Sequence, residues 1–416
     1  MAIVNPFCGV RYNGAKIKDP GKVVSPPYDV IADEELRHLN NLSPYNFTHI
    51  DLPKEQGGMD RYASAKQRFD EWMKTGVLTK DDKPSLYVYR QEYKYQGQKY
   101  NRLGFIGAMR IEDGRDSKVY PHENTHAKAV DDRLAMCKNL KADLSPIFVC
   151  YSDRSRQMDK IFIRHIAPQT PLFEVEDPDK VKHLFWRLSD PALIAQIQQT
   201  VEGQPLFIAD GHHRFKVAQE YRRLCKERNP AGDDEAPYNF VLTYFTNLDS
   251  RDLQIFPMHR IVTRLTKPLH FLDDYFRTDR VKTVGELLII LARAGRNENA
   301  FGLYTREGIR LLRLKNKRLV NDKVKEGSAA YKALDAAILK SFVFDEIGLE
   351  SKDIIYTKDI QRVTAMVDAG EAEAGFIMNS VPIQQLKDVA LSGDKMPPKT
   401  TYFYPKVLSG LVVLPK

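Results

Sequence analysis

Residues 205–215 constrain the fold of this chain more than any other segment. An apolar stretch ends in the turn pair Asp210-Gly211, and a pattern of helical period starts directly after it. We therefore expect a buried strand, a tight turn and a helix over residues 212–228. Apolar residues share one stripe of this helix, and Arg214 lies at the N-terminal end of that stripe.

The first turn of the expected helix carries His212, His213 and Arg214 just after the carboxylate of Asp210. Free backbone N–H groups and the helix dipole already favour an anion at such a position. Positive side chains oppose the dipole there, which suggests that a negative group, most simply a phosphate, completes the site. The alternative is that Asp210 is only an N-cap and the histidines are solvated surface residues.

Composition restricts the class of protein. The 416 residues are 43% apolar and 28% charged, which is typical of a globular protein with two to three domains. We see no apolar run of transmembrane length and no signal-peptide pattern, so we expect a cytoplasmic protein without a membrane partner. The four cysteines are scattered, which indicates free thiols.

The net charge is +8, from 63 basic and 55 acidic residues interspersed along the chain. No block of Lys and Arg marks a nucleic-acid arm, so we do not expect a nucleic-acid partner. A basic balance equally suits a small anionic substrate.

The periodicity predicts an α+β fold with mixed sheets. A β-hairpin is expected over 85–112, and further strands over 146–151, 184–188 and 240–245. The expected helices span 61–74, 127–140, 192–200, 212–228, 284–294, 330–347 and 382–391. We divide the chain into an N-terminal region (1–145), a core region (146–265) and a C-terminal region (266–416).

Residues 122–126 match H-E-x-x-H, the zinc protease motif, which needs both histidines one turn apart in a helix. Pro121 precedes the motif, and Thr125 resembles an N-cap, so His122 is expected outside the helix and His126 inside it. We therefore expect no zinc. A loop with His122, Glu123 and Thr125 ahead of a helix that carries Arg133 is the better description.

Three prolines indicate that residues 396–406 form a loop running into a strand. Lys399, Thr400 and Lys406 could hold a phosphate or a carboxylate. An ordinary proline-rich edge segment explains the same residues.

Seven motifs together resemble one family from end to end, the domain-of-unknown-function family DUF1015. They are Pro26-Pro27-Tyr28-Asp29-Val30, Asn46-Phe47, His122-Glu123-x-Thr125, Asp132-Arg133, Ser145-Pro146-Ile147-Phe148, Ala209-Asp210-Gly211-His212-His213-Arg214 and Met396-Pro397-x-Lys399-x-Thr401-x-Phe403-x-Pro405-Lys406. The family has no settled activity, so this resemblance indicates kinship rather than chemistry.

The Asp-Gly-His-His-Arg segment is in turn similar to the signature of the ParB/sulfiredoxin-like superfamily. Sulfiredoxins place a nucleophilic Cys where this chain has His212, and ParB proteins continue into a helix-turn-helix that we do not see after Arg228. Free serine kinases share this type of segment and are the nearest functional analogue. The comparison is a fold-level analogy.

The resemblance implies phosphoryl transfer between ATP or ADP and a small metabolite, with free serine or phosphoserine as the expected substrate. The predicted catalytic residues are Asp210, Glu123 and His212, and Asp210 and Glu123 are also the predicted Mg²⁺ ligands. The predicted nucleotide and phosphate contacts are Gly211, His213, Arg214, Lys399, Thr400 and Lys406. The predicted substrate contacts are His122, Thr125, Arg133, Asp29 and Asn46.

Two rival functions stay open from the residues. One is a nucleotide-binding regulator without turnover, and the other is a zinc hydrolase that would depend on His122 and His126. The direction of transfer and the oligomeric state are not readable from the sequence. If one site uses both polar segments, Glu123 and His122 converge on Asp210 and His213.

Overall fold

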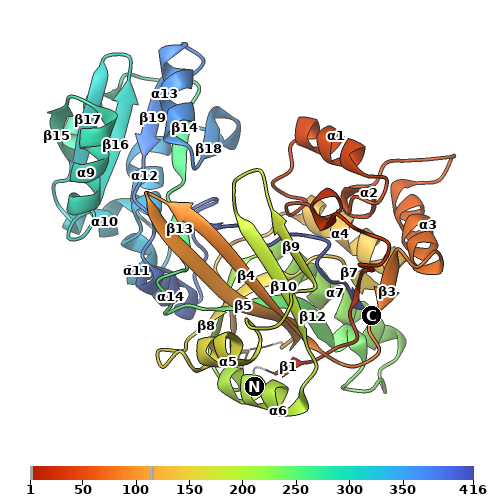
Figure 1. Cartoon of the computed structure of the whole chain (residues 1–416). Coiled ribbons are helices and arrows are strands. Elements are labelled where there is room, and N and C mark those ends of the chain that lie inside the picture. The colour runs from red at the N-terminus through yellow and green to blue at the C-terminus, as the bar shows by residue number, and fades with distance from the viewer. Residues whose placement is uncertain (1–2, 113, 115–116) are drawn as a thin grey trace. The chain divides into compact units, whose positions relative to one another are not determined.

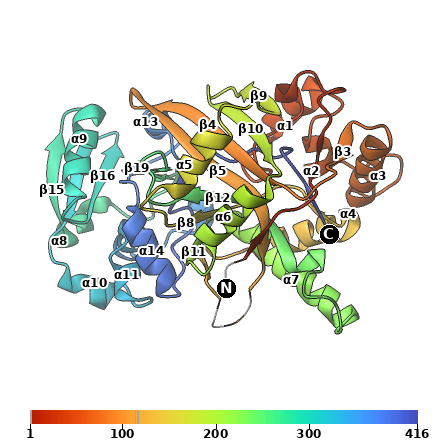
Figure 2. The ribbon, with the colours of Figure 1, turned by 60° about the horizontal axis from the view of Figure 1, so that its bottom comes forward.

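The computed structural model describes residues 3–112, 114 and 117–416, which form two compact units. The first unit comprises Met1–Pro121, Thr125–Gln254 and Pro405–Lys416, and the second comprises His122–Asn124 and Ile255–Tyr404. The boundary expected at residue 145 falls inside the first unit, and the one expected at 265 falls inside the second. The ribbon is drawn in Figures 1 and 2.

The first unit is built on a nine-stranded mixed sheet with the order β6-β11-β8-β12-β5-β4-β10-β9, in which β1 also pairs with β5. The pairs β11–β6 and β12–β8 are parallel, and the other pairs are antiparallel. The predicted α+β class with mixed sheets is confirmed. The strands of this sheet are β1 (Val4–Asn5), β4 (Leu86–Tyr95), β5 (Gln98–Arg110), β6 (Val119–Pro121), β8 (Ile147–Tyr151), β9 (Phe173–Glu176), β10 (Lys182–Leu188), β11 (Leu206–Asp210) and β12 (Phe240–Asn247).

The predicted hairpin is the pair β4–β5, whose register ends with Tyr95 opposite Gln98. The two loop residues, Gln96 and Gly97, both have positive φ angles of 49° and 77°. Two-residue loops of this kind match the right-handed twist of the strands they join. This hairpin carries the long central strands of the sheet (Figure 1).

Helices cover the sheet because their apolar faces need a partner. α5 (Gln157–His165), α6 (Pro191–Val201) and α7 (His212–Arg228) contribute buried side chains to the core of the sheet. Figure 2 shows α5 and α6 over one part of it. α7 also packs on α4 (Ala127–Leu140) through Val217, Val130 and Cys137. The remaining elements of this unit are β2 (Val10–Tyr12), β3 (Leu78–Lys80), β7 (Ala142–Asp143), β21 (Leu414–Pro415), α1 (Asp33–Leu42), α2 (Thr48–Asp51) and α3 (Arg61–Lys74).

The second unit has a six-stranded antiparallel sheet in the order β15-β17-β16-β19-β14-β18. Its core forms between this sheet and the helices α9 and α13. The strands are β14 (His259–Val262), β15 (Phe276–Val281), β16 (Ala300–Thr305), β17 (Gly308–Leu314), β18 (Ile354–Thr357) and β19 (Ala374–Ile377). The other elements are β13 (Gln254–Phe256), β20 (Tyr402–Tyr404), α8 (Leu272–Tyr275), α9 (Val284–Ala294), α10 (Arg318–Lys323), α11 (Ala329–Lys332), α12 (Asp335–Leu339), α13 (Ile360–Asp368) and α14 (Ile383–Leu391).

The prediction of a single helix over 330–347 is wrong. The chain forms α11, then α12, and then a π-helical turn over Lys340–Phe344. The break lies at Leu334, which is extended (φ −68°, ψ 129°) and fully buried. Burial of this side chain outweighs the helical preference of its neighbours. Within the described residues, no helix combines the length and the apolar character needed to cross a membrane.

Candidate functional site

The turn between β11 and α7 forms as the sequence predicts, and glycine is required in it. Gly211 is the N-cap of α7 and has a φ of 85°, a conformation that side chains with a Cβ avoid. A Cβ at this position would lie 3.1 Å from three atoms of the Arg214 guanidinium. The turn therefore lets Arg214 fold back toward the end of the strand.

Asp210 lies at the centre of a small ionic cluster. Its Oδ2 is 3.3 Å from Nζ of Lys406 and 3.7 Å from a terminal nitrogen of Arg214. The side chains of Asp210, Arg214 and Lys406 are 19%, 11% and 15% exposed. Burial by itself would raise the pKa of Asp210, but Lys406, Arg214 and His212 lower it well below its usual value. Asp210 is therefore ionised at neutral pH, and it neutralises part of the positive charge around it.

Arg214 is fixed by a second contact, because its Nη1 donates a hydrogen bond to the carbonyl of Pro146 at the start of β8. The guanidinium thus spans the ends of two neighbouring strands, β11 and β8. Such a planar group with several donors is suited to a bidentate contact with phosphate.

Two buried residues of the β4–β5 hairpin position Lys406, and neither belongs to the motifs quoted above. Gln91 and Arg102 are both 0% exposed and face each other in the strand register. Gln91 Nε2 donates to the carbonyl of Lys406 (2.8 Å), and Arg102 donates to the carbonyl of Pro405. These contacts hold the C-terminal segment on the sheet. The one signal in the sequence is Gln91, a polar residue that shares one face of β4 with Tyr89 and Tyr93.

Arg133 forms a second cluster next to Arg214. From α4 it donates to the carbonyl and carboxylate of Asp51 (2.8 and 3.1 Å) and lies 4.3 Å from the ring centroid of Tyr28. A terminal nitrogen of Arg133 also forms an ion pair with Oδ2 of Asp132, at 2.8 Å. Arg214, Arg133, Tyr28 and Asp51 all line one cavity of about 50 Å³. Five of the family-like motif residues, Tyr28, Arg133, Asp210, Arg214 and Lys406, therefore meet in the first unit.

Electrostatics couple the two clusters. Burial raises the pKa of Tyr28 to about 12, and the charge of Arg214 opposes this rise. Burial also raises the pKa of Asp51, with Arg133 and then Arg214 acting in the opposite direction. Asp51 was missed because a single Asp at the end of a short helix carries no local signal.

His213 joins the first turns of α7 and α4. Its Nε2 accepts the backbone N–H of His126 at 3.0 Å, and the two rings stack with centroids 5.8 Å apart. The expected N-cap at Thr125 and the placement of His126 inside the helix are both wrong by one residue. His126 is the N-cap and α4 begins at Ala127, because this contact with His213 fixes His126 in an extended conformation.

The H-E-x-x-H helix does not form, since neither histidine lies within α4. His122 belongs to the second unit, is 0% exposed, and its Nε2 lies 3.1 Å from the hydroxyl of Thr401. Its carbonyl accepts the N–H of Met396 at 2.7 Å. Among the residues described, no three His, Cys, Asp or Glu side chains cluster as metal ligands would.

The remaining residues that we predicted to contact substrate or phosphate differ in their burial and hydrogen bonding. Asn46 is fully buried and bonds through its amide to the carbonyls of Lys22 and Val24 and to Thr48. Asp29 is exposed, Glu123 and Thr125 are half-buried, and Lys399 is exposed with a φ of 53°. The hydroxyl of Thr400 donates to the carbonyl of Pro397 at 2.6 Å. Glu123, Lys399 and Thr400 lie in the second unit, so their convergence with Asp210 stays a prediction.

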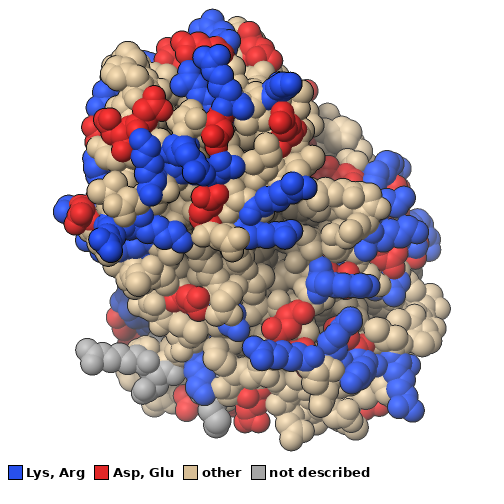
Figure 3. Space-filling view, turned by 90° about the vertical axis from the view of Figure 1, so that its left-hand side faces the viewer, with Lys and Arg blue, Asp and Glu red and all other residues tan. Residues whose placement is uncertain are grey.

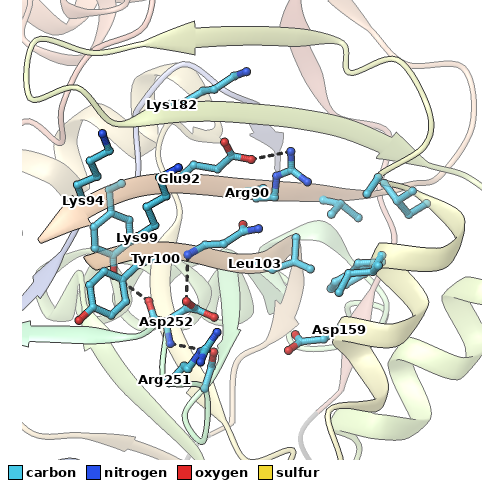
Figure 4. Close-up of a pocket in the computed structure, with 18 of the residues that line it drawn as sticks. Arg90, Glu92, Lys94, Lys99, Tyr100, Leu103, Asp159, Lys182, Arg251 and Asp252 are labelled. Carbon is cyan, nitrogen blue, oxygen red and sulfur yellow. Dashed lines mark hydrogen bonds and ion pairs between the residues drawn. The ribbon is translucent and has the colours of Figure 1, made fainter. Parts of the chain in front are cut away.

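A larger cavity of the first unit, about 860 Å³, lies over β4, β5 and β10 and contains none of the predicted residues. Figure 4 shows it with Arg90 and Glu92 pointing toward one another. Most of its charges are paired, as in Arg90–Glu92 (2.7 Å) and Arg156–Asp159 (2.8 Å). The charged side chains that line this cavity therefore carry both signs. Acidic and basic side chains are likewise interspersed on the face that Figure 3 shows.

Comparisons with known proteins show what this chain is similar to. Among solved structures, it is similar to a free serine kinase in complex with AMP, at 14% identity and a TM-score of 0.34 over 69% of this chain and 83% of that one. A conserved hypothetical protein from Pyrococcus furiosus matches at 13% identity and a TM-score of 0.33 over 70% and 89% of the two chains. SbnI from Staphylococcus aureus, with a C-terminal truncation, matches at 10% identity and a TM-score of 0.38 over 73% and 85%.

No curated protein matches the chain. A family model does: the one described as "Protein of unknown function (DUF1015)" covers residues 4–337. The match extends over most of the chain and includes the β11–α7 turn and the Arg133 cluster, whereas Lys406 of the Asp210 cluster lies beyond its end. The chain therefore belongs to the DUF1015 family, as its motifs led us to expect.

Proposed function

We propose that this protein transfers a phosphoryl group between a nucleotide and a small metabolite, and that the Asp210 cluster binds the phosphate. One observation carries the proposal: Arg214, Lys406 and the N-terminus of α7 surround a single ionised carboxylate at the end of a strand. Phosphoryl transfer needs mainly positioning and neutralisation of charge, and these groups supply both.

The cations are the phosphate-binding groups in this proposal. Arg214 would contact two phosphate oxygens, and Lys406 would act as a point charge on a third. Two of the three charges belong to cations, so a phosphate group entering the cluster meets net attraction. The dipole of α7 adds to it.

Asp210 has a different role from the cations. Its lowered pKa makes it a weak proton acceptor. It is better suited to bind Mg²⁺ or to orient the attacking hydroxyl. The oxygen of that hydroxyl forms a bond to phosphorus while the bond between phosphorus and the leaving oxygen of the nucleotide breaks. Mg²⁺ keeps several waters and usually takes one or two protein carboxylates together with substrate phosphates, so a single carboxylate fits this ion. Glu123 remains the candidate for a second carboxylate.

The substrate is proposed from the Asp-Gly-His-His-Arg segment, which is similar to that of free serine kinases. We propose free serine as the acceptor and ATP or ADP as the nucleotide. A regulator that only binds nucleotide would use the same cations without needing an ionised carboxylate between them.

The test is incubation of the purified protein with Mg²⁺, ATP or ADP and single amino acids, followed by ³¹P NMR. We expect a phosphomonoester signal from wild type and from Arg223→Gln, which alters an exposed arginine of α7 paired only with Glu220 and Glu227. Asp210→Asn should bind ADP but form no product. Nucleotide binding without product in wild type would support the regulator instead.

A further inference from the structure

The second unit contains a polar cavity of about 310 Å³ that shares no residue with the Asp210 cluster. It lies among β14, β19, α12 and α14. Its polar lining side chains are Arg260, Glu298, Asn299, Asp335, Asn379, Ser380, Gln384, Gln385, Asp388 and Thr400. Thr400, one of the residues with the expected anion-binding pattern, is therefore part of this cavity.

Arg260 is the notable member of the cavity because its charge is buried beside the ring of Tyr356, 5.7 Å from the ring centroid, and not in an ion pair. The residue is 4% exposed, and its Nη1 donates to the backbone carbonyl of Met258. Among the described residues, no carboxylate forms an ion pair with it. Burial lowers the pKa of Arg260 to about 10. A carbonyl and a ring face compensate a buried guanidinium less well than a bonded carboxylate does, so an anionic ligand would stabilise Arg260 at this position.

Asp335 provides the opposite charge in the same cavity without touching Arg260. It lies at the start of α12 and accepts a hydrogen bond from Asn299 Nδ2 at 2.7 Å. Burial raises the pKa of Asp335 to about 6, while Asn299 and Arg260 lower it. Asp388 adds a carboxylate that accepts from Gln384 at 2.7 Å, whereas Glu298 is already paired with Arg313 at 3.1 Å.

We propose that this cavity binds a free α-amino acid, with the carboxylate of the ligand on Arg260 and its ammonium group on Asp335. The two protein charges are opposite, line one small cavity and are held apart, which is the complement of a zwitterion. The volume suits a small ligand. A phosphate dianion fits poorly, because Asp335 and Asp388 repel it. The hydroxyl of Ser380 and the amide oxygens of Asn379 and Gln385 line the cavity beside these charges, while Nδ2 of Asn379 and Nε2 of Gln385 donate to the carbonyls of Leu291 and Ala333.

The experiment is calorimetric titration of the full chain with the common L-amino acids, one at a time, without nucleotide. For the amino acid that binds most tightly, the N-acetyl derivative lacks the ammonium group and the decarboxylated amine lacks the carboxylate. We expect each analogue to bind about tenfold to a hundredfold more weakly. Failure of every amino acid to bind, or equal binding of the analogues, would overturn the proposal.

Variants separate binding from folding. Arg260→Met should abolish the binding, while the melting temperature of the unliganded protein stays equal or rises, because a buried charge without a counterion is removed. Asp335→Asn should weaken binding of the amino acid and of its decarboxylated amine, but should not weaken the N-acetyl derivative further, because that derivative has no ammonium group. Arg264→Met, at an exposed arginine of the same unit, is the matched control. A large drop in melting temperature for Arg260→Met with binding intact would make Arg260 a structural residue.

The proposal does not depend on phosphoryl transfer. Arg214→Gln, in the first unit, should retain amino-acid binding whether or not the protein is a phosphotransferase. Loss of amino-acid binding in Arg214→Gln would contradict a site confined to the second unit.

Discussion

Gly211 shows how one residue makes the candidate site possible. Its positive φ turns the chain sharply from β11 into α7, and its missing side chain leaves room for the guanidinium of Arg214. Any other residue would strain the turn and displace the cation from Asp210. The phosphate-binding geometry that we propose therefore depends on backbone conformation as much as on charge.

Gly211→Ala should accordingly lower the free energy of unfolding more than Gly57→Ala does. Both positions have positive φ, 85° and 61°, but a Cβ at Gly57 has no atom within 4 Å. The left-handed conformation alone costs about 1–2 kcal/mol for alanine, and displacement of Arg214 adds about 1 kcal/mol or more at Gly211. Urea denaturation of both variants measures the difference. Equal decreases in the free energy of unfolding for the two variants would mean that Arg214 does not need the space beside Gly211.

The elements of the fold were largely predictable where a local pattern specifies them. The ends of α3, α7 and α9 agree with those expected from periodicity, the N-cap of α4 lies one residue later than expected, and the expected hairpin forms. The helix expected over 330–347 breaks because the burial of Leu334 is decided by tertiary packing. Such long-range packing leaves no mark on local periodicity.

The candidate site was predictable only where neighbouring residues in the sequence specify it. The turn at Gly211 and the cation at Arg214 follow from eleven consecutive residues. Gln91 and Arg102 could not be singled out, because their importance lies in contacts with the carbonyls of Lys406 and Pro405, about three hundred residues away. Only the fold shows that these segments meet.

The side chain of Asn46 connects the loop around Val24 to the start of α2 through hydrogen bonds. Asn46→Ala should lower the free energy of unfolding by about 2–4 kcal/mol, because several buried hydrogen bonds lose a partner. Asn139→Ala is the control, as that side chain makes one exposed bond to the carbonyl of Ala135. If Asn46→Ala instead weakened substrate binding and left stability unchanged, the substrate role expected from the sequence would be correct.

The molecule as a whole combines two units with different candidate ligands. The first unit gathers cations around Asp210, and the second unit holds Arg260 and Asp335 in a separate cavity. The basic charge balance of the chain does not distinguish these sites, but their local chemistry does. One suits a phosphate and the other suits a zwitterion.

Amino-acid binding in the second unit should depend on pH. Asp335 has a pKa of about 6 in the empty protein, and a bound ammonium group lowers that pKa further. Affinity should therefore be constant above pH about 6 and fall by up to about tenfold per unit below it, as a proton must leave Asp335 on binding. His259, with a pKa of about 4, stays neutral in this range. Titrations across this range should show the fall in wild type, and a similar fall in Asp335→Asn would contradict the assignment.

The most direct test of the central claim is the ADP affinity of Arg214→Gln, measured by calorimetry beside its melting temperature. Arg214 bonds to Pro146 and Asp210 in the first unit, so the variant separates a phosphate contact from a structural one. We expect an affinity about 30- to 1000-fold below that of wild type, with a nearly unchanged melting temperature. Arg223→Gln should bind as wild type does. Unchanged ADP affinity in Arg214→Gln, with a clearly lower melting temperature, would contradict the account.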